Sequence, residues 1–294
     1  MSHVALLDEA GGDFRVMDAR RLAELNVGRL NVDRRASLSP NNPETERLRD
    51  LAGGMEIPLP TGFKPNGASS ATRPRLRKLY VEIQLAVDSM FYEMVEERLA
   101  IPLPMLRAEH VSGAHFSSCH WAPKQGEESG RPIIDPSNGD EGSCVLNGKE
   151  VKRSAIERRG PVTLPTIETI MAKFITFKNE FKRPRSGIEL WKMDLKGAFT
   201  LLSFKASNCQ LIATELEGGV ALFFLCGIFG WTATPITATP IAFAVVSRAI
   251  LHEMEERTGA ACDMFVDDAL AASLIEEATS DRATTCGDHR ESHR

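Results

Sequence analysis

The chain has 294 residues and a net charge of −5, with 43% apolar and 26% charged residues. This composition is ordinary for a globular protein and excludes a wholly disordered chain, a coiled coil and a collagen-like repeat. The longest apolar run, residues 220–229, is about half as long as a membrane-spanning helix. The acidic N-terminal segment lacks the apolar stretch of a signal peptide, and the six cysteines include no CxxC pair. We therefore expect an intracellular protein, cytoplasmic or nuclear, with reduced thiols and no membrane contact.

The N-terminal quarter is poor in apolar periodicity and rich in Pro, Gly, Asn and Ser. We interpret residues 1–75 as an extended or partly disordered leader with one short helix near residues 19–30. Helical spacing of apolar residues then predicts a helix over about residues 75–99, which the IPLP sequence at 101–104 ends. The expected apolar face of this helix consists of Leu76, Leu79, Val81, Ile83, Leu85, Ala86, Met90, Phe91 and Val95.

The middle of the chain alternates between strand and helix patterns. Residues 110–147 are expected to form loops and strands, and residues 163–182 a helix. The core-facing stripe of this second helix is expected to contain Ile167, Ile170, Met171, Phe174, Phe177 and Phe181. A short strand over residues 188–194, a turn at 196–197 and a buried strand over 220–229 are predicted next.

The C-terminal part is predicted to contain one helix and one hairpin. The helix spans about residues 240–257, with Thr239 as its N-cap and Pro240 at its first position. Residues 262–273 are expected to form two strands that meet at a turn with two adjacent aspartates. Residues 276–294 have almost nothing to bury and are expected to fray.

Charge is unevenly distributed along the chain. Residues 149–185 hold ten Lys or Arg and four Glu, a balance of +6, whereas residues 253–294 hold eleven Asp or Glu and four Arg, a balance of −7. A basic stretch followed by an acidic one suits an enzyme that binds phosphates and holds metal ions. Two solvated surfaces are the alternative explanation.

Three carboxylates occupy the ends of apolar segments. Asp194 ends the segment WKMD, and Asp267 and Asp268 lie in FVDD. A buried aspartate is costly unless something neutralises it, and Mg²⁺ prefers such oxygen ligands together with substrate phosphates. Two metal ions about 4 Å apart can activate an attacking hydroxyl and stabilise a leaving pyrophosphate. For FVDD alone, a polar hairpin turn is the simpler explanation.

Two cations flank the turn QGEESG. Lys124 and Arg131 are predicted to face each other across two strands, an arrangement that is unfavourable by up to about 1 kcal/mol. A triphosphate bound between them would reverse the repulsion. Glu127 and Glu128 in the turn could neutralise them instead.

A cluster of metal-ligand residue types carries a weaker signal. His115, Cys119 and His120 form an HxxxCH group, but no second ligand pair lies at a typical zinc spacing. We therefore predict no zinc site here. The sequence also lacks a nucleophile elbow, a P-loop and a dinucleotide-binding fingerprint.

Four segments, in chain order, resemble motifs of reverse transcriptases, specifically the polymerases of DIRS-type or related retroelements. HFSSCHWAPKQGEESGRPIIDPSN resembles the fingers hairpin that handles the incoming triphosphate, and WKMDLKGAFTLL resembles the first palm motif. GIFGWTATP with IAFAVVSRAI resembles the motif that positions template and nucleotide, and MFVDDALAA resembles the YVDD-type hairpin. NPETERLRDLAGG and GFKPN also resemble this group, and the likeness spans about residues 40–275.

The resemblance implies an α+β fold with the fingers and palm of a right-hand polymerase, an antiparallel palm sheet backed by helices, and no thumb. It places a fingers-like region at residues 76–187 and the palm core at 188–275, which includes a fingers segment at about 205–230. The implied activity is RNA-directed DNA polymerisation, in which a primer 3′-hydroxyl attacks the α-phosphate of a dNTP on an RNA or DNA template–primer. The alternative is a truncated, non-catalytic retroelement relic that binds nucleic acid weakly. Whether a separate chain supplies the thumb or RNase H is left open.

The resemblance also assigns catalytic roles by position. Asp194, Asp267 and Asp268 match the catalytic acids. Asp194, the backbone carbonyl of Leu195 and Asp267 match the ligands of two Mg²⁺ or Mn²⁺ ions. Asp268 matches the third acid, which supports the site more than it binds metal.

Nucleotide binding is assigned in the same way. Gly197 and Ala198 match the turn whose amides approach the triphosphate, and Phe199 matches the aromatic residue that excludes a 2′-hydroxyl. The remaining matches are Lys124, Arg131 and Gly230. The sequence departs from the family in its tandem TATPI repeat at residues 232–241, which adds five residues between Gly230 and the predicted helix.

Overall fold

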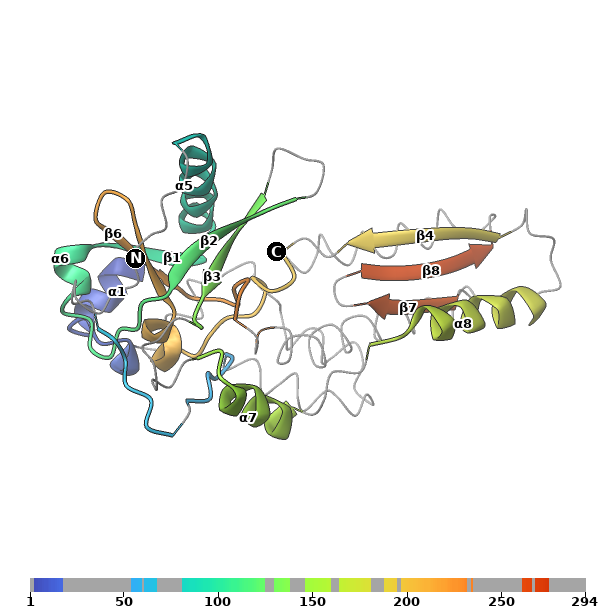
Figure 1. The fold of residues 1–294 in the computed structure, drawn as a ribbon, viewed down its shortest axis with the longest axis horizontal. Helices are drawn as coiled ribbons and strands as arrows, with labels where there is room; N and C mark the ends of the chain where they lie inside the picture. Colours follow the sequence, from blue (N-terminus) through green and yellow to red (C-terminus); the bar gives the residue numbers. More distant parts are fainter. Residues whose placement is uncertain are drawn as a thin grey trace. The chain divides into compact units, whose positions relative to one another are not determined.

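A computed structural model describes residues 3–17, 54–59, 61–67, 81–124, 130–137, 146–159, 164–180, 188–194, 197–231, 234, 261–265 and 268–274. This part of the chain combines helices with small antiparallel sheets (Figure 1), which confirms the expected α+β class at that level. The chain divides into two compact units. The first comprises residues 1–27, 54–158 and 199–234, and the second comprises residues 28–53, 159–198 and 235–294.

The first unit is built around a three-stranded antiparallel sheet. Its strands are β1 (Ala100–Pro104), β6 (Val220–Phe224) and β5 (Ala213–Leu216), in the order β1-β6-β5. The apolar run that was predicted to be one buried strand forms the central strand β6 and remains buried as far as Ile228. β1 tolerates its two prolines because it lies at an edge of this sheet, where a missing backbone donor costs little.

The extreme N-terminal segment differs from the expected extended leader. Residues 3–17 contain the helix α1 (His3–Glu9) and the short 3₁₀ helix η1 (Phe14–Val16), and the Phe14 ring packs 5.4 Å from that of Phe223. The buried apolar side chains of this segment are Leu6, Leu7, Phe14 and Met17. Residues 1–75 are polar on average, but these four apolar side chains near the N-terminus are buried in the core. The helix expected near residues 19–30 lies outside the described residues.

The first predicted helix is confirmed over α5 (Val81–Glu96), but its buried face is shifted. Val87 and Phe91 are buried, and the Phe91 ring lies 6.1 Å from that of Phe224, whereas Leu85 is 70% exposed. Val87 and Phe91, which are four residues apart, face the sheet. The sequence could not identify this pair, because several other apolar residues of the helix have a similar spacing. The IPLP segment forms β1 itself.

The described residues of the first unit also include the helices α6, η3 and α7 and a β-hairpin. The strands β2 (Ser118–Pro123) and β3 (Gly130–Asp135) pair as an antiparallel hairpin, as expected for the region 110–147. The helices are α6 (Met105–Ala108), the 3₁₀ helix η3 (Ala206–Leu211) and α7 (Lys149–Arg159). α7 was not predicted, because its few apolar residues give little periodic signal.

In its described residues, the second unit contains a three-stranded antiparallel sheet and a helix beside it. β4 (Ile188–Asp194), β8 (Asp268–Leu274) and β7 (Ala261–Phe265) run in the order β4-β8-β7, so β8 is central (Figure 1). The predicted strand over residues 188–194 and the predicted hairpin over 262–273 are confirmed.

The second predicted helix is confirmed as α8 (Ile167–Glu180), which lies alongside β7. Phe177 packs with Ala261 and Ala272, and Phe174 contacts the same cluster. Ile167 and Met171, which were expected in the core, are 77% and 47% exposed. The small sheet covers only part of the apolar circumference of the helix, so the rest of the stripe stays at the surface.

Some predictions fall outside the described residues. These are the helix over residues 240–257, the frayed tail over 276–294 and the TATPI repeat apart from Thr234. The division into a fingers-like region at 76–187 and a palm core at 188–275 stays a prediction, although contacts group α8 with the second unit and residues 199–234 with the first. Within the described ranges, no helix is long and apolar enough to cross a membrane.

Candidate functional site

Two of the three predicted catalytic acids, Asp194 and Asp268, lie at one end of the β4-β8-β7 sheet. In the antiparallel register, Asp194 at the end of β4 lies directly opposite Asp268 at the start of β8. Opposed residues of this kind have Cα atoms about 4.5–5.5 Å apart. Asp268 also lies opposite Phe265, so β7 and β8 are joined by residues 266–267 alone. Asp267 itself is outside the described residues, but it directly precedes Asp268, the residue of β8 that pairs with Asp194.

A lysine neutralises one of these acids. The Nζ atom of Lys192 lies 2.7 Å from Oδ2 of Asp268, whose side chain is 26% exposed. Lys192 precedes Asp194 by two residues, so both belong to the same face of β4. Asp268 is therefore paired within the protein, and its supporting role stays a prediction. Sequence reasoning missed Lys192, and its i−2 spacing from Asp194 was the available signal.

The turn after β4 contains the next two predicted residues. Gly197 is exposed and has a left-handed backbone with φ of 66°, and Ala198 is buried. Glycine adopts this backbone conformation without steric cost, and the close approach of a triphosphate to this turn stays a prediction. Leu195, the predicted carbonyl ligand, lies outside the described residues.

In the first unit, three aromatic and cationic side chains form a stack. The guanidinium of Arg131, on β3, lies 5.1 Å from the ring centre of Phe229. The ring of Phe199 meets Phe229 edge-on, with centres 5.2 Å apart. Such cation–π and aromatic contacts each contribute about 0.5–1.5 kcal/mol. Both rings are half-buried and Arg131 is exposed, so the stack borders solvent.

The hairpin register corrects one prediction about these cations. Arg131 lies opposite Ala122, and Lys124 follows the last paired residue of β2. Lys124 and Arg131 are therefore diagonal neighbours and do not face each other directly. The difference arises because strand register, which is decided by pairing, determines which residues are opposed.

Gly230 follows Phe229 and is exposed, but one side of it packs closely against the backbone of β3. Its φ is 108°, and a Cβ atom there would overlap the carbonyl oxygen of Ile134. The amide of Ile134 donates to the carbonyl of Phe229 over 2.9 Å. Asn147 donates from Nδ2 to the carbonyl of Gly230 over 2.7 Å, and Trp231 donates from Nε1 to the carbonyl of Leu146 over 3.2 Å. The Gly230 segment is thus clamped between β3 and the start of α7.

The HxxxCH group has the features of core residues. Burial raises the pKa of the Cys119 thiol to about 12, whereas zinc binds the thiolate. His120 instead places Nε2 3.3 Å from Oδ2 of Asp135. Among the described residues, which do not include Asp267, no three His, Cys, Asp or Glu side chains could share a metal ion.

His115 is expected to make stability depend on pH. Burial lowers its pKa to about 4, and its Nδ1 accepts a 3.4 Å hydrogen bond from the Asn66 amide. Between pH 6.5 and 4 the unfolded chain therefore binds a proton that the folded chain does not. Lowering the pH from 7.5 to 4 should cost about 3 kcal/mol of unfolding free energy through this residue.

Urea unfolding at pH 7.5 and pH 4 gives the change in unfolding free energy between the two pH values. This change should be smaller in His115→Gln than in the wild type by the contribution of His115. The exposed His110 provides the matched control, since His110→Gln should retain the wild-type dependence. Equal pH dependence in His115→Gln and the wild type would refute the assignment.

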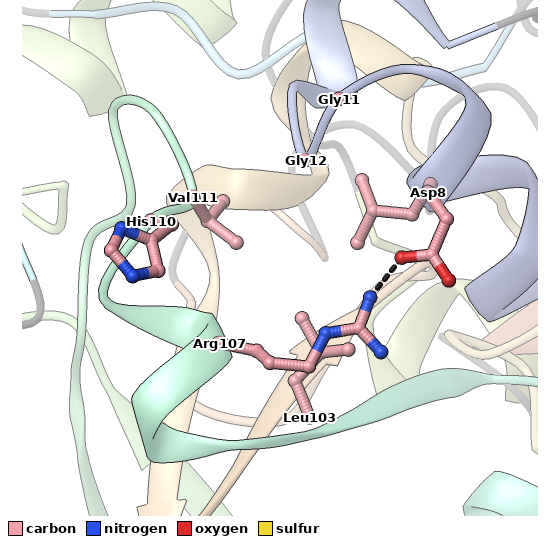
Figure 2. Close-up of a pocket in the computed structure, with 8 residues that line it drawn as sticks. Asp8, Gly11, Gly12, Leu103, Arg107, His110 and Val111 are labelled. Atoms are coloured by element: carbon pink, nitrogen blue, oxygen red, sulfur yellow. Dashed lines mark hydrogen bonds and ion pairs between the residues drawn. The ribbon is translucent and has the colours of Figure 1, made fainter.

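A pocket lies apart from all the predicted site residues. It has a volume of about 190 Å³, and Figure 2 shows Arg107 paired with Asp8 across it, below the Gly11–Gly12 turn. Its other lining residues are Leu7, Leu103, His110 and Val111. This volume is below the range of about 300–1,000 Å³ that is typical of ligand sites. Because the ion pair also cancels the charge of Arg107, we assign the pocket no function.

Compared with known proteins, the chain matches no family model and none of the curated proteins.

Proposed function

We propose that the chain is the fingers and palm of an RNA-directed DNA polymerase of a DIRS-type or related retroelement. The observation that carries this proposal is the register of β4 and β8, which sets Asp194 against Asp268 beside Asp267. A nucleotidyl-transfer site needs carboxylates gathered in this way at one sheet end. The four motifs in order supply the reaction class.

In this proposal two divalent cations bind at the acid end. Lys192 engages Asp268, so Asp194 and Asp267 would supply the anionic oxygen donors that Mg²⁺ or Mn²⁺ prefers. The bound ions would supply charge stabilisation for the attacking and leaving oxygens. The primer 3′-hydroxyl attacks the α-phosphorus of the dNTP, the bond to the β-phosphate oxygen breaks, and pyrophosphate leaves. Asp194 and Asp267 hold the reacting groups in place, and the hydroxyl proton passes to solvent.

The Arg131–Phe229–Phe199 stack is the proposed nucleotide platform. Its half-buried rings offer apolar surface to a base or deoxyribose, and the exposed guanidinium offers a phosphate partner. The contact with Phe229 limits the rotation of the Phe199 ring. A ring that is held in place can exclude a 2′-hydroxyl by steric overlap. Lys124 is exposed on the same hairpin and adds a second cation.

A non-catalytic relic is the second candidate function. The tandem TATPI repeat favours it, because five additional residues follow the clamped Gly230 segment. In this case nucleic-acid binding would persist without polymerisation.

Primer extension tests the proposal directly. The purified chain is incubated with a DNA primer annealed to an RNA template, dNTPs and either Mg²⁺ or Mn²⁺. We expect extension that depends on the metal, stops with a chelator, and is lost when NTPs replace dNTPs. Oligonucleotide binding without extension in either metal would favour the relic, and absence of both would refute the two candidates together.

A further inference from the structure

The helix α7 carries its charges on separate flanks. At about 100° per residue, Lys149, Lys152 and Arg153 lie within about 100° of its circumference. Glu150 and Glu157 occupy the adjacent flank, and Glu157 approaches Arg153 to 3.7 Å. All five side chains are exposed, and Val151 and Ala155 anchor the opposite side in the core. α7 therefore presents a cationic strip, defined as Lys149, Lys152 and Arg153, with an acidic border.

The start of α7 is tied to the candidate nucleotide platform. Asn147, two residues before α7, donates to the carbonyl of Gly230, and Leu146 accepts from Trp231. Gly230 directly follows Phe229, the central ring of the Arg131–Phe229–Phe199 stack. The cationic strip thus begins beside a pair of half-exposed aromatic rings within one compact unit.

We propose that the cationic strip of α7 binds the phosphate backbone of a single-stranded nucleic acid that leads to the Phe199–Phe229 rings. This inference rests on the proposed function and identifies the surface that holds the template strand. A row of cations next to aromatic rings is the combination that binds single strands, since phosphates and base faces are recognised together. From Lys149 to Arg153 the strip rises about 6 Å along α7, which is close to the span of three successive phosphates at about 3.4 Å each.

The apolar residues of α7 argue against a membrane surface as the partner. A helix that lies on a membrane exposes its apolar face to the lipid. Val151 and Ala155 are instead buried within the protein, and the exposed positions around the cationic strip are charged.

The test is the salt dependence of binding to fluorescein-labelled ten-nucleotide oligothymidylate, measured by anisotropy. One triple variant carries Lys149→Gln, Lys152→Gln and Arg153→Gln, and a charge-preserving variant carries Lys149→Arg, Lys152→Arg and Arg153→Lys. The matched control removes three cations elsewhere in the same unit, with Lys64→Gln, Arg107→Gln and Lys205→Gln.

The α7 triple variant should flatten the slope of log K against log salt by about 2, because each single-strand phosphate contact contributes about 0.7. At 0.1 M salt this corresponds to binding weakened by about a hundredfold. The charge-preserving variant should bind as the wild type does, and the control should keep the wild-type slope. Thermal melts establish that all variants fold.

Equal slopes in the α7 triple variant and the wild type would overturn the inference, and so would equal losses in the α7 and control triples. Either result with intact primer extension leaves the proposed function standing. A wild-type chain that binds no oligonucleotide at 50 mM salt would overturn both. Binding to phosphatidylserine vesicles in place of oligonucleotide, dependent on Lys149, would also overturn the inference.

Discussion

Replacing Asp267 by Asn is expected to lower the rate of primer extension by about a thousandfold, which corresponds to about 4 kcal/mol of transition-state stabilisation. The neutral amide keeps the size of the side chain but removes the anionic oxygen that the metal ions need. Asp194→Asn should show the same loss, because β4 places residue 194 at the same sheet end. Steady-state extension rates with saturating dNTP measure both effects.

Two further variants make this experiment specific. Asp263, on β7, lies opposite Leu270 and away from the sheet end, so Asp263→Asn should retain wild-type activity. Asp268→Asn should lose less activity than Asp267→Asn, since Asp268 pairs with Lys192. Titration with Mn²⁺ provides an independent readout, in which Asp194→Asn and Asp267→Asn should weaken binding. Unchanged extension in Asp267→Asn would contradict its assigned role.

Gly230→Ala is expected to destabilise the protein by about 3 kcal/mol, the sum of backbone strain and steric overlap. The new methyl group would overlap the carbonyl of Ile134, which is backbone and cannot rotate away. Relief would require breaking the clamp between Phe229 and β3. Equilibrium urea unfolding gives the change in free energy.

Gly218 is the matched control for Gly230. It also has a positive φ, 91°, but a Cβ atom there meets nothing within 4 Å. Gly218→Ala should therefore cost only the conformational term, about 1 kcal/mol. Similar losses for both variants would show that the Ile134 carbonyl imposes no extra constraint.

Short-range patterns in the sequence predicted several elements correctly. The helical spacing of apolar residues located α5 and α8, and the runs that end in aspartates located β4 and the β7–β8 hairpin. The helices are local, because a helix satisfies its backbone hydrogen bonds within a few residues, and the β7–β8 strands are close in sequence, whereas β4 was located by its apolar pattern although it pairs with the distant β8. The motif order likewise predicted the acids and the glycine positions without knowledge of distant contacts.

Tertiary contacts decided which residues meet. The sequence could not show that Arg131 lies over Phe229 and opposite Ala122, because register depends on pairing between strands. Nor could it show that Lys192 pairs with Asp268, since 76 positions separate them in the chain. Residues 3–17 were assigned to an extended leader because residues 1–75 show little apolar periodicity, yet Phe14 packs on Phe223. The sequence by itself thus determined the local elements and the candidate chemistry. The partners of each side chain depended on apolar burial and strand pairing between segments that are distant in the sequence.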